Sequence, residues 1–122
     1  MLKIAVVGDQ FMKASFFEKA LRARLGANCE IKSWESAWPD EPFAGRDGPA
    51  GEAISEYSGD LDTVKALVAD AEIAITHLGP FSREVIAAAP KLRFIGVSRG
   101  GPVNIDIGAA RERGIVGANV PG

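Results

Sequence analysis

The sequence is poor in the residues that build metal centres and disulfides. It contains one cysteine, Cys29, and one histidine, His77. A single cysteine cannot form an internal disulfide, and one residue of each kind leaves too few ligands for a Cys/His zinc site. The apolar runs are far too short to cross a bilayer, and the N-terminus lacks the small-residue cleavage site of a signal peptide. We therefore expect a cytoplasmic domain with no membrane partner.

Neither sign of charge is in excess. The 122 residues carry 14 Lys and Arg against 16 Asp and Glu, which gives a net charge of −2. A nucleic-acid-binding domain usually has a basic excess, so we expect no nucleic-acid partner. Apolar residues make up 47% and charged residues 25%, close to the globular average, which excludes a disordered chain. The length suits one domain.

The hydrophobic pattern alternates between strands and helices. Short apolar runs predict strands at residues 3–8, 29–34, 72–76, 93–98 and 115–120. Apolar side chains at helical spacing predict helices at residues 14–25, 61–69, 83–89 and 105–113. This order is typical of parallel strands joined by right-handed crossovers. It predicts an α/β fold, a flavodoxin-like three-layer sandwich with a five-stranded parallel sheet in the order 2-1-3-4-5.

The helix ends have their own signals. Asp60 and Ser82 are predicted N-caps, and Asn104 is a candidate cap for the last helix. Gly26 and Gly114 are predicted to end the first and last helices. The sequence stops just after the last predicted strand, so we expect the chain to be a piece of a larger protein.

Residues 35–59 fit neither pattern. They are rich in proline and glycine and have no sustained period. A connection this long is uncommon in a small domain. It indicates either a functional loop or an element that the pattern misses, and a short turn of helix near residues 51–57 is one candidate.

Ligand sites in open parallel sheets lie beyond the carboxyl ends of the strands. Three predicted loops occupy that position, at residues 8–10, 76–79 and 98–102. In the third loop Gly100 and Gly101 let the backbone approach a ligand, and N–H groups beside Arg99 can hold an anion. The same two glycines also fit a tight strand-to-helix turn with no ligand.

The sequence allows two hypotheses for the role of His77 and two for the role of Asp9. His77 either lines the crevice at the strand ends or is an ordinary half-buried histidine, and no carboxylate at helical spacing is available to orient it. Asp9 either contacts a ligand or caps the next helix, and capping is the expected role. The chain has no Gly-x-Gly-x-x-Gly and no Gly-x-x-x-x-Gly-Lys-Ser/Thr motif, so it lacks the usual cradles for a pyrophosphate.

A longer pattern begins near residue 84, with EVIAAAPKLRFIGVSRGGPVNIDIGAARERGIVGANVPG. It resembles the D-isomer-specific 2-hydroxyacid dehydrogenases, especially their phosphoglycerate-dehydrogenase-like members. The likeness is strong over residues 71–122 and weaker before them. It implies a flavodoxin-like substrate domain, spanning residues 1–122 and ending at the hinge into a nucleotide-binding domain that would hold NAD or NADP. The family's catalytic Arg, Glu and His and its dinucleotide motif would lie downstream, so this chain would hold no catalytic residue and no cofactor.

The resemblance also implies where a small 2-hydroxy or 2-oxo acid would bind. Gly100 and Gly101 fall where backbone amides of the family receive the substrate carboxylate. Asn104 matches an Asn at the head of the helix near the hinge. The loop that closes over the substrate corresponds to four residues, Thr76, His77, Leu78 and Gly79.

Two departures bear on the substrate. Phosphoglycerate dehydrogenases usually have an Arg-Ser pair where Thr76 and His77 stand, and that arginine helps to hold a phosphate. Arg99 and Pro102 also differ from the family's usual turn, and Arg99 either supplies the missing charge or faces solvent. We expect an oxidoreductase acting on the CH–OH group of a D-2-hydroxy acid, in a homo-oligomer. The alternative is a stand-alone flavodoxin-like binding or response module without catalysis.

Overall fold

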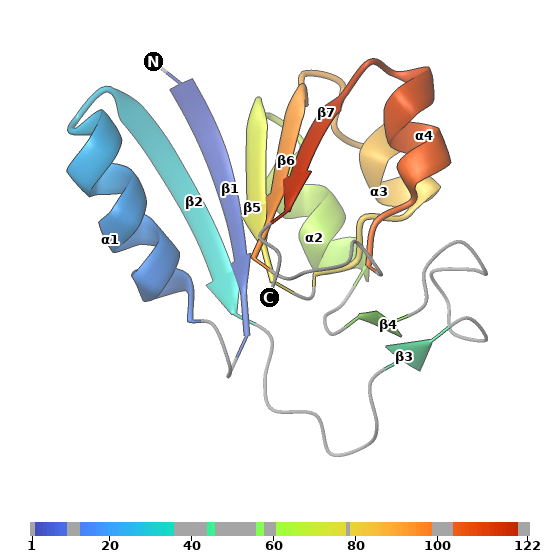
Figure 1. Ribbon diagram of the computed structural model, residues 1–122, viewed down its shortest axis with the longest axis horizontal. Helices are drawn as coiled ribbons and strands as arrows, with labels where there is room; N and C mark the ends of the chain where they lie inside the picture. Colours follow the sequence, from blue (N-terminus) through green and yellow to red (C-terminus); the bar gives the residue numbers. More distant parts are fainter. Residues whose placement is uncertain are drawn as a thin grey trace.

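The computed structural model describes residues 2–9, 13–35, 44–45, 56–57, 61–77, 79–98 and 104–119 (Figure 1). The strands are β1 (Leu2–Gly8), β2 (Cys29–Glu35), β3 (Ala44–Gly45), β4 (Glu56–Tyr57), β5 (Ile73–Thr76), β6 (Phe94–Val97) and β7 (Val116–Asn119). The helices are α1 (Ala14–Leu25), α2 (Leu61–Val68), α3 (Arg83–Ala87) and α4 (Ile107–Glu112). Within these ranges no helix is long and apolar enough to cross a membrane.

The main sheet has the predicted topology. Its strand order is β2-β1-β5-β6-β7, and every neighbouring pair is parallel. Counting only these five strands, the order is 2-1-3-4-5, so the predicted fold class is confirmed. Figure 1 shows α1 on one face of the sheet and α2, α3 and α4 on the other.

Alternate residues of β1 pack into two separate hydrophobic cores, one on each face of the sheet. Ala5 and Val7 are buried under the helices α2, α3 and α4, together with Phe81 and other apolar side chains. Ile4 and Val6 point to the opposite face, where they pack with Phe17 of α1. Burial of β1 on both faces explains its continuous apolar run, which is the pattern of a central strand in a parallel sheet.

The α1 face of the sheet is only partly covered by the described helices. Helix α1 lies against β1 and β2. The register continues the same face across β5, β6 and β7 through Ile73, Phe94 and Val116. Ile73 and Phe94 are half-buried, and Val116 is 60% exposed. These three side chains form an apolar stripe on a part of the face that none of the described helices covers.

Most predicted helix ends are confirmed. The Ser82 side chain accepts a hydrogen bond from the Val85 N–H, and Gly26 and Gly114 have the positive φ values of 62° and 69° that favour glycine after a helix. The prediction for Asn104 is wrong, because α4 begins two residues later than expected and Asp106 is its cap. Asp60 lies outside the described residues.

The long segment at residues 35–59 contains an element that the sequence pattern missed. Strands β3 and β4 form an antiparallel pair, with Ala44 opposite Tyr57. The expected helix near residues 51–57 is wrong at its end, since Glu56–Tyr57 is a strand. Two-residue strands are too short to leave a period in the sequence, which is why the pairing had no local signal.

Candidate functional site

Strands β1 and β5 form the point where the chain reverses its direction across the sheet. From β1 the chain continues to β2 on one side, and from β5 it continues to β6 on the other. The connections that leave the two carboxyl ends lead to α1 and α3, which lie on opposite faces (Figure 1). In doubly wound sheets, ligands bind in the crevice at such a switch point. The residues that follow β1 and β5 are therefore the first candidates for a site.

Thr76, the last residue of β5, ties the following loop to β1. Its side chain is fully buried, and its hydroxyl donates a hydrogen bond to the Val7 carbonyl oxygen at 3.1 Å. The same hydroxyl accepts one from the Gly79 N–H at 2.8 Å. A Cβ at Gly79 would lie 2.6 Å from Thr76 Oγ1 and 2.7 Å from Val7 Cγ1, so only glycine fits there. These contacts fix the loop against the end of β1.

Asn104 holds the same loop from the other side. It is fully buried, and its Nδ2 donates to the Gly79 carbonyl oxygen at 2.7 Å. Its neighbour Ile105 forms a parallel bridge with Phe81, in which the Phe81 N–H donates to the Asn104 carbonyl oxygen at 2.9 Å. The segment after β5 and the residues just before α4 are thus joined by side-chain and backbone hydrogen bonds.

His77 lies beside Asp9. The distance from His77 Nδ1 to Asp9 Oδ2 is 2.9 Å, and the exposed fractions of the two side chains are 18% and 5%. The expected helix-capping role of Asp9 is wrong: Lys13 is the N-cap residue of α1, and the Ala14 N–H donates to Glu35 Oε1 at 2.6 Å. The carboxylate beside His77 comes from the residue that directly follows the adjacent strand β1.

The pair has no local signal in the sequence, because Asp9 lies 68 positions before His77 and not at helical spacing from it. The register places Val7 opposite Thr76, so the residues just beyond each strand end meet. A polar residue immediately after each of two apolar strands was the available signal. It becomes informative only when the two strands are known to be neighbours.

Ser98 is a further polar residue at this edge that the predicted site did not include. It follows β6, and its N–H donates to the Thr76 carbonyl oxygen at 3.0 Å. Among the described residues, two buried side-chain atoms have no hydrogen-bond partner, and they are Ser98 Oγ and Asn104 Oδ1. Both flank the predicted glycine turn. Leu78, Arg99, Gly100 and Gly101 lie outside the described residues.

The resolved pKa shifts belong to exposed ion pairs between helices. A hydrogen bond from Arg83 lowers the pKa of Glu112, and a hydrogen bond with Glu84 raises the pKa of Lys65. Exposed pairs of this kind contribute little to stability. These ion pairs link α3 to α4 and α2 to α3. They involve none of the residues in the strand-end loops.

The described residues do not fit a dinucleotide. A pyrophosphate is normally held at the N-terminus of the first helix after a glycine-rich turn. Here the Glu35 carboxylate already accepts the Ala14 N–H of α1, and the buried Asp9 carboxylate follows β1. Both groups would repel a pyrophosphate. In the described part of the chain, no three His, Cys, Asp or Glu side chains gather to hold a metal ion.

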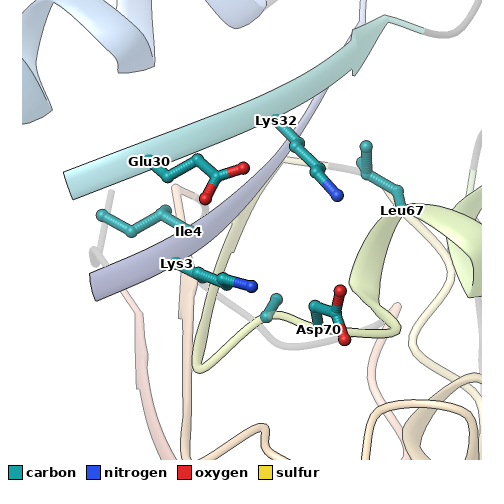
Figure 2. A pocket seen from close by; sticks show the side chains of 7 residues that line it. Lys3, Ile4, Glu30, Lys32, Leu67 and Asp70 are labelled. Carbon is teal, nitrogen blue, oxygen red and sulfur yellow. The ribbon is translucent and has the colours of Figure 1, made fainter. Parts of the chain in front are cut away.

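Two hollows are lined by residues outside the predicted site. Figure 2 shows the side chains of Lys3, Lys32 and Asp70 around an opening of about 10 Å³, which has room for a single water molecule. The second has a volume of about 240 Å³ and lies between α4 and the strands β6 and β7. Its lining residues, which lie between positions 95 and 118 of the sequence, are apolar or glycine except for Arg111. Neither hollow includes a predicted site residue.

Comparisons with known proteins agree with this architecture. Residues 47–122 match the family model of the D-isomer specific 2-hydroxyacid dehydrogenase catalytic domain. A hydroxypyruvate reductase from Blautia hydrogenotrophica is 39% identical over 62 residues, which are 51% of this chain and 19% of that protein. A glyoxylate reductase from Korarchaeum cryptofilum is 35% identical over 100 residues, which are 82% of this chain and 25% of that protein.

The solved structures support the fold. Apo D-lactate dehydrogenase from Escherichia coli superposes with a TM-score of 0.63 at 18% identity, over 99% of this chain and 31% of that one. The chain therefore spans a quarter or less of the two curated relatives and about a third of this structure. The family model covers more than half of the sequence, and the topology agrees. This chain belongs to the D-isomer specific 2-hydroxyacid dehydrogenase family.

Proposed function

We propose that this chain supplies the substrate-binding side of an NAD(P)-dependent D-2-hydroxyacid dehydrogenase. Its ligand would be a small 2-oxo or 2-hydroxy acid, bound at the carboxyl ends of β1, β5 and β6. The observation that carries the proposal is the buried hydrogen-bond network of Thr76, Gly79 and Asn104. This network braces a loop at the switch point of the sheet, where ligands of this fold class bind.

The proposed residues divide into two groups by burial. Thr76 and Asn104 are fully buried and hold the loop, so their role is to position its backbone. His77 is partly exposed and faces the substrate side of the loop in this proposal. The ligand's carboxylate would be received by a separate set in the next turn, consisting of Arg99, Gly100 and Gly101, with Leu78 closing over it. Backbone N–H groups are suited to this task because they are fixed before the ligand arrives.

The nicotinamide cofactor that the family implies would be held elsewhere in the protein, because these residues do not fit it. The test is an assay of the full-length protein with NADH or NADPH and three 2-oxo acids, hydroxypyruvate, glyoxylate and pyruvate. We expect cofactor oxidation that depends on the 2-oxo acid. A full-length protein that binds these acids without turnover would instead support the alternative, a binding module.

The 122-residue chain alone is predicted to bind no NADH. Its sequence has no dinucleotide motif, and the N-terminus of α1 already carries the Glu35 carboxylate. Nicotinamide fluorescence, followed during a titration with this chain, checks the prediction. Saturable binding at micromolar concentrations would contradict it.

We also expect copies of this chain to associate, in line with the proposed homo-oligomer. The apolar stripe of Ile73, Phe94 and Val116 would be covered by a second copy, because exposed apolar patches favour association. Light scattering over a concentration series should show a rising mass, and Val116→Lys should suppress the rise. A monodisperse monomer at the highest concentration would rule out this association.

A further inference from the structure

The hollow between α4 and the strands β6 and β7 is an apolar cavity that the proposed substrate site does not use. Its volume is about 240 Å³. Several of its lining side chains are almost completely buried, among them Ile95, Ile105 and Ile115. Two others are exposed, and they are Ile107 and Arg111 of α4. The cavity thus combines an apolar interior with an exposed basic residue.

A missing side chain on β7 accounts for part of this cavity. Gly117 is paired with Ile95, and the two residues lie on the same face of the sheet. A Cβ added at Gly117 would have no heavy atom within 4 Å, apart from its chain neighbours. Gly117 is not among the glycines with positive φ, so its backbone does not require glycine. A larger side chain at this position would therefore fill the cavity without strain.

Arg111 is the one charged residue among the described residues that line the cavity. In the described part of the chain its guanidinium makes no hydrogen bond and no ion pair. The charged groups that follow it are engaged, because Glu112 pairs with Arg83 and Arg113 donates to two backbone carbonyl oxygens at the end of α3. Asp106 caps the opposite end of α4. Arg111 is therefore available to an anionic group.

We propose that this cavity binds a small apolar carboxylate, with its hydrocarbon part in the interior and its carboxylate group on Arg111. A planar guanidinium matches a carboxylate in charge and in geometry. The other lining side chains have no hydrogen-bonding group, and a polar group buried among them would lose its hydration without compensation. The ligand is therefore apolar apart from its single anionic end.

The volume sets the size of the ligand. An apolar cavity of about 150 Å³ can hold one benzene molecule, so about 240 Å³ is enough for roughly eight carbon atoms. Octanoate has this size and the required charge. It differs from a small 2-oxo acid, whose polar groups would be buried without partners in this cavity.

The experiment is a calorimetric titration of the full-length protein with octanoate as the probe. We expect saturable binding with a Kd of about 1 mM or lower, the affinity of a well-buried ligand of about ten non-hydrogen atoms. 1-Octanol has the same chain without the charge and should bind about fivefold more weakly. Saturating oxalate should not displace octanoate, because oxalate has no apolar part.

Variants of Arg111 test the contribution of its charge. Arg111→Met keeps an apolar chain but removes the charge, and it should weaken octanoate binding about fivefold to tenfold while leaving 1-octanol unaffected. Arg111→Lys keeps the charge and should retain most of the affinity. The matched control is Arg24→Met, since Arg24 is likewise an exposed arginine in the last turn of a helix. It should leave octanoate binding unchanged.

Variants of Gly117 test the location of the site. Gly117→Leu should abolish octanoate binding by filling the cavity, and its unfolding curve should show no loss of stability because the space beside Gly117 is open. Gly117→Ala adds only a methyl group and should bind octanoate nearly as the wild type does.

Three results would overturn the proposal. The first is the absence of saturable octanoate binding in the wild type, which would mean that another part of the full-length protein occupies the cavity. The second is displacement of octanoate by oxalate, which would place octanoate at the strand ends. The third is binding that persists at full affinity in both Arg111→Met and Gly117→Leu. None of these readouts depends on turnover, so the proposed function and this proposal can fail separately.

Discussion

Gly79→Ala is expected to lower the free energy of unfolding by about 2–3 kcal/mol, the effect of overpacking a rigid site. The new Cβ would lie 2.6 Å from Thr76 Oγ1 and 2.7 Å from Val7 Cγ1, and both neighbours are fully buried. Because Gly79 is not among the glycines with positive φ, the cost is steric. The loop must move, so the affinity for a 2-oxo acid should also fall. Denaturant unfolding and substrate KM, measured on the full-length protein, check both effects.

The matched control is Gly117→Ala on the edge strand β7. A Cβ at Gly117 has no heavy atom within 4 Å, apart from its chain neighbours. Surface changes of this kind alter stability by less than about 0.5 kcal/mol. Equal destabilisation by both substitutions would show that the tight packing around Gly79 is not what determines the effect.

Thr76→Val is expected to cost about 2–4 kcal/mol. It keeps the shape of the side chain but leaves the Val7 carbonyl and the Gly79 N–H without their shared hydroxyl. Each buried group left unpaired costs about 1–3 kcal/mol. Since the loop would lose its attachment to β1, the substrate KM should rise as well.

Thr76→Ser is the control for that prediction, because it removes only a methyl group and keeps the hydroxyl. We expect it to retain most of the stability and nearly the wild-type KM, as unfolding curves and steady-state kinetics of both variants can show. If the valine variant has the same stability and KM as the serine variant, the two hydrogen bonds are not needed to hold the loop.

The parts of the fold that the sequence predicted are those with a local physical cause. The continuous apolar run of β1 reflects burial on both faces, and the four-residue spacing of Phe17 and Leu21 reflects one buried face of α1. Ser82 and Gly114 act within one turn of their helices. Each signal needs only residues that are neighbours in the chain.

The parts that were missed depend on residues far apart in the chain. Asp9 and His77 are separated by 68 positions and meet only because β1 pairs with β5. Asn104 looked like a helix cap, but its side chain bonds to the Gly79 carbonyl, and Asp106 caps α4 instead. The candidate site could thus be located from sequence at the level of loops, whereas the partners of its side chains required the sheet register.

The central claim is that a 2-oxo acid binds at the carboxyl ends of β1, β5 and β6. Amide hydrogen exchange of the full-length protein, with and without the unreactive dicarboxylate oxalate, tests it most directly. We predict that protection within residues 1–122 concentrates in the peptides that contain Asp9, His77 and the turn at Gly100 and Gly101. Protection confined to peptides of α4 and β7, or no change in any of these peptides at saturating oxalate, would contradict the claim.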